Sequence, residues 1–438
     1  MSLRRFRLWA QEMLFWRPFS RYRALRYAVA AVAVVWRRLL FRTTFIAITG
    51  SLGKTTAKEC LAAALGSRFW TVKSSGNRNA GLGLFVSVLR VRPWHRFAVL
   101  EVAGAMPDNM RRLARLVRPD VAVILNVLRT HTTAFPTLEA HAEEKTRLLD
   151  AVRAGGLVLL NADDPRVAAM ADRHRLRVRR FGTSSSFDVW ADQVSARWPE
   201  RLVFRAHVGA ESHVVGTQLV GTHWLPSVLA AVATARYCGV PLRDAAEAVR
   251  RVEPFPARLQ PLRLPVGAIV LRDDYNASID TLDVACRVLE EARAGRRLFV
   301  VNDFSDLGKN RKHRLRYLAE RAARGAEVAL FIGESAAYGR RRAIEAGMPP
   351  SAVHDFPSVE AAARFLRTEL RPDDLMLLKG RTTDHAARIF FAQLGEVGCW
   401  KVYCSKRTLC DNCWELGTRP KDAAAAAPGL LTPRHHGG

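Results

Sequence analysis

The stretch ITGSLGKTT, residues 48–56, lies between a short apolar run and a helical pattern, and it decides how the chain is read. It contains G-x-x-G-K-T, with Gly50 and Gly53 placed ahead of Lys54 and Thr55. A strand that ends in a glycine turn and continues as a helix directs backbone N–H groups towards a phosphate. We therefore predict a nucleotide-binding loop, in which Lys54 neutralises the β- and γ-phosphates and the Thr55 hydroxyl binds Mg²⁺.

The segments on either side of this loop predict an α/β fold. FIAIT (45–49), FAVLEVA (97–103), VAVILNV (121–127) and GLVLLNA (156–162) are apolar runs separated by helical patterns. Fully apolar strands that alternate with helices are typical of a parallel sheet covered on both faces. Shorter alternating segments within 187–220 indicate antiparallel strands at the sheet edge, and a helical pair is expected at 223–250.

A boundary is expected at VEPFPARLQPLRLP, residues 252–265, where four prolines fall close together. Beyond it the α/β pattern starts again. The predicted fold class is thus a P-loop central parallel-sheet ATPase domain followed by a smaller Rossmann-like α/β domain. The expected divisions are 1–44 (basic, aromatic and helical), 45–258 (ATP-binding), 259–398 (Rossmann-like), 399–416 (four cysteines) and 417–438 (a disordered tail).

The charge of the chain is strongly positive, because 68 Lys and Arg minus 41 Asp and Glu leave +27. Nucleic acid, an anionic membrane surface and acidic substrates all fit this charge. Residues 1–42 hold ten arginines against one acid, Glu12, and their apolar run at 27–36 is about half the length of a membrane span. Peripheral contact with the membrane and packing on the protein body are both open interpretations of this segment. We expect a cytoplasmic protein, with the cytoplasmic membrane face as its alternative site.

Four of the seven cysteines form the pattern C-x4-C-x5-C-x2-C near the end of the chain. They are Cys399, Cys404, Cys410 and Cys413. Four thiols at such short spacing suit one tetrahedral Zn²⁺. An iron–sulfur cluster, free thiols and disulfides are the alternatives. Cys60, Cys238 and Cys286 lie in helical patterns, which suggests buried thiols in a reducing compartment.

The loop and the stretches that follow it resemble the Mur ligase family, the ATP-dependent amide-bond-forming enzymes of peptidoglycan synthesis, and in particular its MurF-like branch. GSLGKTT (50–56) matches the family's loop, which has no earlier glycine. The other matches follow in family order: GNRNAGLG (76–83), AVLE (98–101), THTTAFPTLEAHAEEK (130–145), LNADDP (160–165), DDYNASID (273–280), NDFSDLG (302–308) and LLKG (377–380). On these stretches the chain is identified as a member of the family.

The resemblance implies a set of site residues. ATP would be bound by Gly50, Gly53, Lys54, Thr55, Thr56 and Asn77, by Arg258 in the hinge region, and by Asp274 and Asn276 beyond it. One Mg²⁺ would be held by Thr55 and Glu101, and a second by His131 and a carbamate on Lys145. Lys54, Lys145 and His131 are the implied catalytic residues. An ordinary ion-pair role for Lys145 is the alternative, since carbamylation cannot be read from a sequence.

The resemblance also implies the reaction. A substrate carboxylate would attack the γ-phosphate of ATP, and an amine would attack the resulting acyl phosphate, so that a carboxylate-bearing peptide or sugar-peptide is joined to an amino acid or dipeptide. Only about 44 residues precede the loop, so we expect no UDP-sugar domain ahead of it. The family's H-N-x-x-N appears as HWLPS (223–227), and its E-L-G-A-N as EVAGA (101–105). These departures leave a regulatory ATP-binding homologue as an alternative; a nucleic-acid-dependent ATPase is a remote one, and no nucleic-acid partner is expected.

Overall fold

The computed structural model describes residues 23–76, 81–104, 106–129, 135–173, 176–302, 311–402, 404 and 409–417. The chain folds into two compact units. Unit 1 comprises the residues up to Ser195 together with Leu202–Thr217 and Thr222–Val252. Unit 2 comprises Ala196–Arg201, Gln218–Gly221 and the residues from Glu253 onward. None of the helices in the described ranges combines the length and apolar character needed to cross a bilayer.

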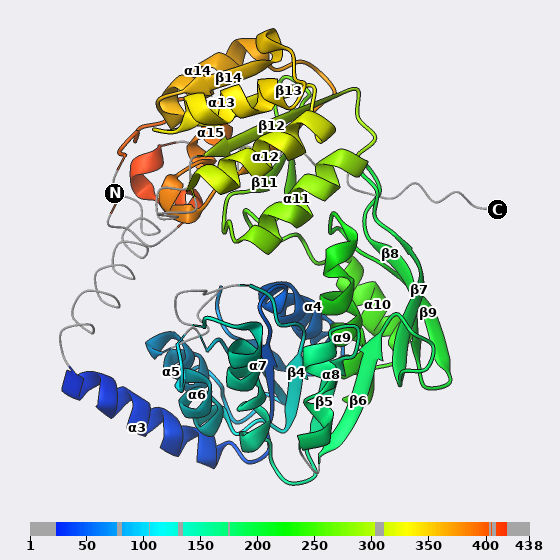
Figure 1. Ribbon diagram of the computed structural model, residues 1–438. Helices are drawn as coiled ribbons and strands as arrows, with labels where there is room; N and C mark the ends of the chain where they lie inside the picture. Colours follow the sequence, from blue (N-terminus) through cyan, green and yellow to red (C-terminus); the bar gives the residue numbers. More distant parts are fainter. Residues whose placement is uncertain are drawn as a thin grey trace. The chain divides into compact units, whose positions relative to one another are not determined.

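Unit 1 contains a nine-stranded sheet in the order β2-β3-β1-β4-β5-β6-β7-β8-β9 (Figure 1). Its strands are β1 (Thr44–Thr49), β2 (Thr71–Lys73), β3 (Phe97–Glu101), β4 (Val121–Ile124), β5 (Leu157–Asn161), β6 (Arg177–Gly182), β7 (Val189–Ser195), β8 (Val203–Val208) and β9 (Glu211–Gly216). Pairing is parallel from β2 to β7 and antiparallel from β7 to β9, as expected for the edge. The helices are α3 (Arg23–Leu39), α4 (Lys54–Gly66), α5 (Leu82–Leu89), α6 (Asn109–Val117), α7 (Leu138–Thr146), α8 (Pro165–Ala168), α9 (Leu225–Tyr237) and α10 (Leu242–Arg250).

The apolar strands of unit 1 are buried on both faces. Phe45 and Ala47 of β1 pack into a core with α3, α5 and α6. The alternate residues Ile46 and Ile48 are equally buried and face the other side of the sheet. There α4, α9 and α10 pack against one another and against the strands. Burial on both sides explains why these strands have no polar alternation in the sequence.

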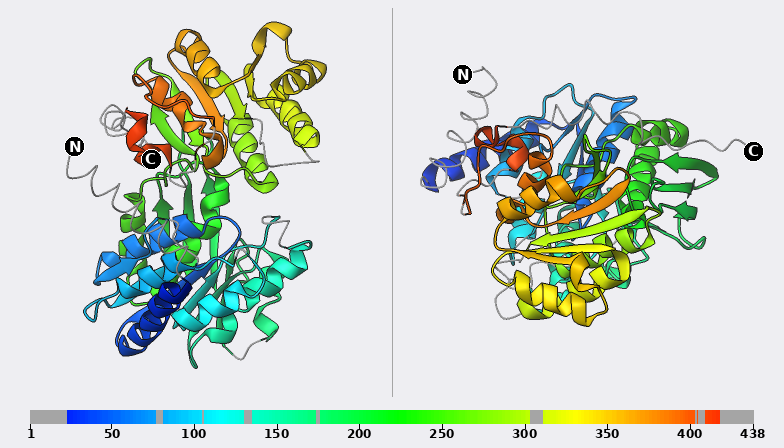
Figure 2. Two further views of the ribbon diagram at one scale, coloured as in Figure 1. Left: turned by 90° about the vertical axis from the view of Figure 1, so that its left-hand side faces the viewer. Right: turned by 90° about the horizontal axis from the view of Figure 1, so that it is seen from above.

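Unit 2 contains a six-stranded sheet in the order β10-β11-β15-β12-β13-β14, in which only β10 is antiparallel to its neighbour. The strands are β10 (Gln260–Arg263), β11 (Ile269–Asp273), β12 (Arg296–Asn302), β13 (Val328–Ile332), β14 (Val353–Phe356) and β15 (Asp374–Lys379). The helices are α11 (Ile279–Glu291), α12 (Arg311–Gly325), α13 (Ala336–Glu345), α14 (Val359–Glu369) and α15 (Ala387–Ala392). Two apolar cores, with α11, α12 and α13 on one face and α14 and α15 on the other, enclose the sheet (Figure 2).

Both units therefore have the predicted α/β class, a parallel-rich sheet between helices. In each sheet the carboxyl ends of the parallel strands lie at one edge. Thr49 and Glu101 end two such strands in unit 1, and Asp273 and Lys379 end two in unit 2. Ligands of such α/β sheets bind beyond the carboxyl ends of the strands, so these two edges are where binding residues are expected.

Candidate active site

The phosphate loop of unit 1 joins the end of β1 to the start of α4 and contains two glycines that have no room for a side chain. Gly53 has φ +85°, in the left-handed region, and a Cβ added there would lie 2.1 Å from Ser227 Oγ. A Cβ on Gly50 would lie 2.9 Å from the Cβ of Leu125. Both positions suit glycine because neighbouring side chains occupy the space where a Cβ would lie.

Asn126, which follows β4, holds this loop from the next strand. Its Oδ1 accepts hydrogen bonds from the backbone N–H groups of Ser51 (2.9 Å) and Leu52 (2.8 Å). Its Nδ2 donates to the backbone oxygen of Leu52 (3.1 Å). Asn126 was not among the predicted residues. The signal was a polar residue at the carboxyl end of the apolar run VAVILNV.

Lys54 and Thr55 begin α4 and take the positions expected of a phosphate loop. Lys54 Nζ donates to the backbone oxygens of Gly50 (2.7 Å) and Ser51 (3.2 Å), which holds the ammonium over the loop. Thr55 Oγ1 donates to Glu101 Oε2 across 2.9 Å, and both residues are buried. Two adjacent oxygen donors beside the loop have the chemistry that Mg²⁺ prefers. Thr56, the next residue along the helix, is also buried.

Lys145 lies in the last turn of α7 and is buried, with 3% of its surface exposed. Burial lowers its pKa well below the usual 10.5, and the charge of Lys54 lowers it further, whereas Glu144 opposes the shift. The influence of Lys54 means that the fold brings Lys145 within electrostatic reach of the phosphate loop. The neighbouring Glu144 accepts hydrogen bonds from the backbone N–H groups of Asp108 (3.1 Å) and Met110 (2.7 Å), so it stabilises the start of α6.

Two predicted residues, Asn77 and His131, lie outside the described residues. Ten positions after His131 in the sequence, the structure describes His141, which is buried and stacks on Phe135 at a ring-centroid distance of 4.9 Å. Its Nδ1 lies 3.1 Å from the backbone oxygen of Leu128. His141 was not predicted, although it stands one helical turn before Lys145.

Unit 2 has its own polar cluster where β11 and β15 end. Lys379 is buried, and its Nζ donates to Asp273 Oδ2 (2.6 Å) and to the backbone oxygen of Asn276 (2.6 Å). Predicted Asn276 therefore belongs to this cluster through its main chain. Asp273 and Lys379 were not named as site residues, although the quoted stretches DDYNASID and LLKG contain them.

The other two predicted residues of unit 2 have different surroundings. The guanidinium of Arg258 lies over the ring of Tyr275, 4.3 Å from its centroid. Its Nε is buried and has no hydrogen-bond partner in the part of the chain that the structure describes. Asp274, by contrast, is buried and directs both carboxylate oxygens to Arg272 (3.1 and 3.0 Å). In this structure Asp274 is thus engaged in an internal ion pair.

Arg272 joins Asp274 to the cysteine-containing segment at the end of the described chain. Its Nη1 and Nη2 donate to the two carboxylate oxygens of Asp411 at 2.7 and 3.0 Å. The guanidinium also lies 5.2 and 5.3 Å from the ring centroids of Phe390 and Phe391. Burial alone lowers the pKa of Arg272, but the two carboxylates outweigh it and raise the pKa above its usual value. The buried charge is therefore fully compensated.

The structure does not assemble the four cysteines into the predicted zinc site. All four are described and none forms a disulfide, and no group of three or more His, Cys, Asp or Glu side chains among the described residues is placed to hold a metal ion. Cys410 instead packs into the apolar core of unit 2, with its Sγ 3.5 Å from His385 Nδ1. Burial raises the pKa of the Cys410 thiol to about 11 and lowers that of His385 to about 4. Close spacing in the sequence therefore did not predict convergence in space, because packing directs this thiol inward.

We expect Asp411→Asn to lower the free energy of unfolding by about 1–3 kcal/mol, because two hydrogen bonds to a buried guanidinium are lost or weakened. Asp274 still neutralises Arg272, so the loss is smaller than for a charge left alone. Urea denaturation measures it. Glu415→Gln is the matched control, since Glu415 pairs with Lys401, which is 61% exposed, and its removal should cost less than about 1 kcal/mol. Equal stability of both variants would show that Asp411 does not secure Arg272.

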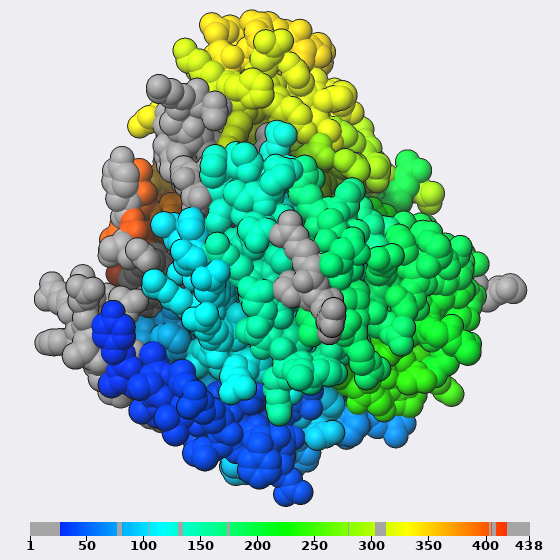
Figure 3. Space-filling model, turned by 60° about the horizontal axis from the view of Figure 1, so that its bottom comes forward, coloured from blue at the N-terminus to red at the C-terminus, as the bar shows by residue number. Residues whose placement is uncertain are grey.

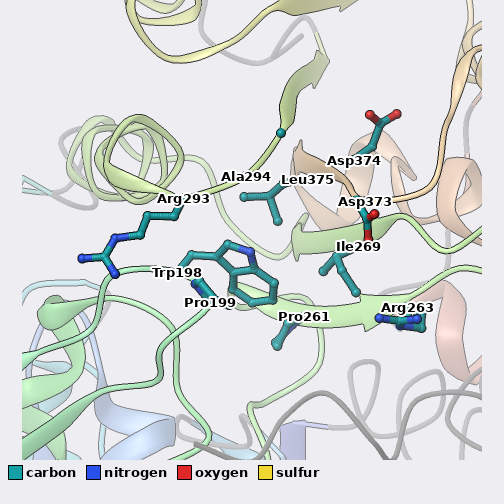
Figure 4. A pocket seen from close by; sticks show the side chains of 11 residues that line it. Trp198, Pro199, Pro261, Arg263, Ile269, Arg293, Ala294, Asp373, Asp374 and Leu375 are labelled. Carbon is teal, nitrogen blue, oxygen red and sulfur yellow. The ribbon is translucent and has the colours of Figure 1, made fainter. Parts of the chain in front are cut away.

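A cavity of about 290 Å³ lies in unit 2 at the amino ends of β11, β12 and β15 (Figure 4). Trp198, Pro261, Ile269 and Leu375 provide its apolar walls. None of the predicted site residues lines it. It lies at the opposite end of these strands from Asp273 and Lys379, so it is separate from the polar cluster described above.

Two models of known protein families match this chain. Residues 48–235 match the Mur ligase middle domain, and residues 257–382 match the Mur ligase, glutamate ligase domain. The chain is 31% identical over 396 residues to a UDP-N-acetylmuramoyl-tripeptide–D-alanyl-D-alanine ligase of Mycobacterium tuberculosis, an alignment that covers 86% of this chain and 78% of that protein. The ligase of the same name from Bacillus subtilis is 27% identical over 273 residues, covering 61% and 57%.

Solved structures show the same fold. MurF from Acinetobacter baumannii superposes with a TM-score of 0.76 at 24% identity, covering 83% of this chain and 79% of that one. MurF from Thermotoga maritima in complex with ADP gives a TM-score of 0.70 at 23% identity, covering 85% and 83%. These similarities show the fold alone, and the site described above comes from the structure of this chain.

Proposed function

The chain belongs to the Mur ligase family of ATP-dependent amide-bond-forming ligases, and from this membership we propose that it joins a carboxylate-bearing peptide or sugar-peptide to the amine of an amino acid or dipeptide through an acyl phosphate. Its relatives are named for UDP-N-acetylmuramoyl-tripeptide and D-alanyl-D-alanine. We propose these two compounds as its first candidate substrates, with a role in cell-wall or cell-surface polymer synthesis. None of the seven cysteines, all of which the structure describes, forms a disulfide; this fits a reducing compartment, and we propose that the reaction takes place in the cytoplasm.

The proposed reaction has two steps. A carboxylate oxygen of the first substrate attacks the γ-phosphorus of ATP, the bond to the β-phosphate oxygen breaks, and ADP leaves. The amine nitrogen of the second substrate then attacks the acyl carbon, the carbon–oxygen bond to phosphate breaks, and the amine gives up a proton. The products are an amide, ADP and phosphate. The first step brings a carboxylate and a triphosphate together, so the site must supply positive charge.

The phosphate loop supplies part of this charge. Lys54, now bonded to the carbonyl oxygens of Gly50 and Ser51, has its ammonium over the loop and can exchange these acceptors for phosphate oxygens. The hydroxyl of Thr55 and the carboxylate of Glu101, 2.9 Å apart and buried, are suited to hold Mg²⁺. When bound, Mg²⁺ would neutralise charge on the phosphates. Asn126 fixes the loop by accepting hydrogen bonds from the N–H groups of Ser51 and Leu52, and the backbone N–H groups at the start of α4 would orient the triphosphate.

The observation that carries the proposal is the buried Lys145. A lysine that serves only as a surface ion-pair partner has no reason to be 3% exposed with its pKa well below 10.5. A lowered pKa makes the neutral amine available, and only the neutral amine adds CO₂ to form a carbamate. A carbamate would turn this nitrogen into a pair of oxygen donors near the phosphate loop, suited to a second Mg²⁺. Predicted His131 remains its proposed companion.

The purified protein tests this directly. With ATP, Mg²⁺, bicarbonate and both candidate substrates, we expect ADP release that requires the carboxylate and the amine together. With the carboxylate and hydroxylamine in place of the amine, we expect a hydroxamate, because hydroxylamine captures an acyl phosphate. Mass spectrometry of the products identifies the amide.

Two outcomes would contradict the proposal. ADP release that is unaffected by any carboxylate or amine across a broad panel would indicate a simple ATPase. Amide formation without hydroxamate, at saturating hydroxylamine, would contradict the acyl phosphate while leaving the ligase activity in place. A panel that varies the sugar-peptide and the amine separately then defines the substrates.

A further inference from the structure

Exposed apolar side chains gather at one edge of unit 1. Twelve large apolar side chains of the described residues are exposed, and half of them belong to this edge. We call them the amino-edge surface: Val32, Val35, Leu39, Phe41, Trp70 and Trp94. They range from 56% to 75% exposed. This concentration on one helix and the strand starts beside it needs an explanation, because exposed apolar residues are normally scattered singly.

Helix α3 is firmly attached to unit 1 by its inner face. Trp36 Nε1 donates to the backbone oxygen of Val91 (2.9 Å). Arg37 is buried, donates to the backbone oxygens of Val117 (2.6 Å) and Arg118 (2.8 Å), and lies 3.7 Å from the centroid of the Phe45 ring. The helix thus packs on unit 1 through a tryptophan and a compensated arginine, and its position does not depend on its outer face.

The outer face of α3 is apolar. Val32, Val35 and Leu39 are spaced by three and four residues, so they lie on one side of the helix. Figure 3 shows α3, in dark blue, as a ridge along the surface of unit 1. In a helix at a protein–water boundary this outer stripe is normally polar. Here the polar contacts are on the inner face and the valines and leucine face outward, which is the arrangement of a helix covered by something else.

The rest of the amino-edge surface lies at the starts of adjacent strands. Phe41 precedes β1, Trp70 precedes β2 and Trp94 precedes β3, and these three strands are neighbours in the sheet. Backbone hydrogen bonds hold the segments together: Arg96 N donates to Trp70 O (2.8 Å), and Arg96 Nη1 donates to Arg42 O (3.3 Å). The phosphate loop is at the carboxyl ends of the same strands, so the surface faces away from it.

The charges around this surface are positive. Arg38, Arg42, Arg92 and Arg96 are exposed beside its apolar side chains. The nearby acids are compensated by arginines: Asp120 pairs with Arg37 (3.6 Å) and Arg153 (2.9 Å), and Asp244 pairs with Arg68. The sequence ahead of α3 adds arginines and aromatic residues with a single acid. Apolar and tryptophan side chains ringed by arginines match the boundary between headgroups and acyl chains of an anionic bilayer.

We propose that the amino-edge surface docks on an anionic lipid bilayer. The valines and the leucine of α3 enter the headgroup boundary, the two tryptophans and Phe41 anchor beside them, and the arginines bind lipid phosphates. The helix lies along the membrane without crossing it. This docking goes beyond the proposed ligase reaction and does not rest on it. Phe41, Trp70 and Trp94 lie at the opposite ends of the strands from the phosphate loop, so docking through them does not involve the loop.

Co-sedimentation of the full chain with vesicles tests the docking. We expect binding to vesicles of equal parts phosphatidylglycerol and phosphatidylcholine, and little binding to phosphatidylcholine alone. Binding should weaken when NaCl rises from about 0.05 to about 0.5 M, because salt screens the arginines. The double variant Val35→Asp/Leu39→Asp should bind anionic vesicles with an affinity lower by about ten-fold or more, since two apolar anchors become charged. Val214→Asp on β9 is the matched control, because Val214 is 46% exposed and far from this edge in the sheet order.

Three results would overturn the proposal. The first is equal binding of the double variant and the wild type to anionic vesicles. The second is no vesicle binding by the wild type at low salt. The third is that the wild type forms a dimer and binds no vesicles, whereas the double variant is a monomer. That result would assign the surface to a second copy of the chain. Val35 and Leu39 are more than half exposed, so the fold should persist, and unchanged thermal unfolding of the variant verifies it.

Discussion

Replacing Lys145 by methionine is expected to remove amide-bond formation while making the protein more stable. Methionine has a similar length and no amine, so it cannot form a carbamate or carry charge near the phosphate loop. We expect kcat to fall about 10²–10³-fold or more, the usual loss when a group that stabilises developing charge is removed. KM for ATP should change less, because Lys54 and the loop N–H groups remain.

The rise in stability follows from the direction of the pKa shift. Burial holds the pKa of Lys145 well below 10.5 in the folded protein, whereas the unfolded chain has the ordinary lysine value of about 10.4. Between these two values the unfolded state binds the additional proton, so stability increases as pH rises through this window. Lys145→Met removes that dependence. Its stabilising effect should therefore be largest below the folded pKa and disappear above about pH 10.4.

Thermal unfolding in CO₂-free buffer at several pH values, together with ligase assays, measures both effects. Lys58→Met is the control, because Lys58 is also buried but its Nζ donates to the backbone oxygens of Ser74 (2.9 Å) and Gly76. Its loss should destabilise the protein. A Lys145→Met variant that keeps full ligase activity would remove Lys145 from the mechanism. A variant that is less stable at neutral pH would contradict a buried amine whose charge Glu144 offsets only in part.

Gly53→Ala is expected to have the second large effect, on ATP binding. The residue needs φ +85°, where an alanine costs about 1–2 kcal/mol, and its Cβ would lie 2.1 Å from Ser227 Oγ. The clash between this Cβ and Ser227 is relieved only if the Ser227 side chain turns or the loop moves. Since Lys54 and Thr55 follow directly, displacement of the loop misplaces both, and we expect kcat/KM for ATP to fall on the order of 10²-fold.

Two further variants separate the causes. Gly53→Ala/Ser227→Ala removes the clash but keeps the strained backbone, so it should recover part of the activity and not all of it. Gly66→Ala, at the other end of α4, is the matched control. No atom lies within 4 Å of its added Cβ, and the substitution should stabilise the helix by about 0.5–1 kcal/mol. Wild-type activity of Gly53→Ala would show that the loop tolerates a side chain at this position.

Much of the fold was predictable because it depends on local patterns. The apolar runs around β1, β3, β4 and β5 predicted a buried parallel sheet, and the glycine turn after β1 predicted the phosphate loop. The resemblance to the Mur ligases paired Thr55 with Glu101 as ligands of one Mg²⁺, and in the structure Thr55 Oγ1 lies 2.9 Å from Glu101 Oε2. The domain limits and the roles of the site residues remain predictions.

Other features depended on contacts between distant segments. Asn126 holds the phosphate loop from 74 and 75 positions away, and Asp411 reaches Arg272 from 139 positions away. Neither contact corresponds to a periodic pattern in the sequence. The described residues hold no zinc-binding group for a similar reason: spacing brings cysteines near one another along the chain, but packing directs Cys410 into the apolar core of unit 2.

The sequence by itself determined the α/β class, the phosphate loop and the family, because these depend on apolar periodicity and on residues whose chemistry acts within a few positions. Only the tertiary structure decided which charges are buried and what opposes them. It placed Lys145 in a dry site near Lys54, enclosed Arg272 between two carboxylates, and turned the apolar face of α3 outward. Burial and the dielectric environment arise only when distant segments pack together, so no local pattern can record them.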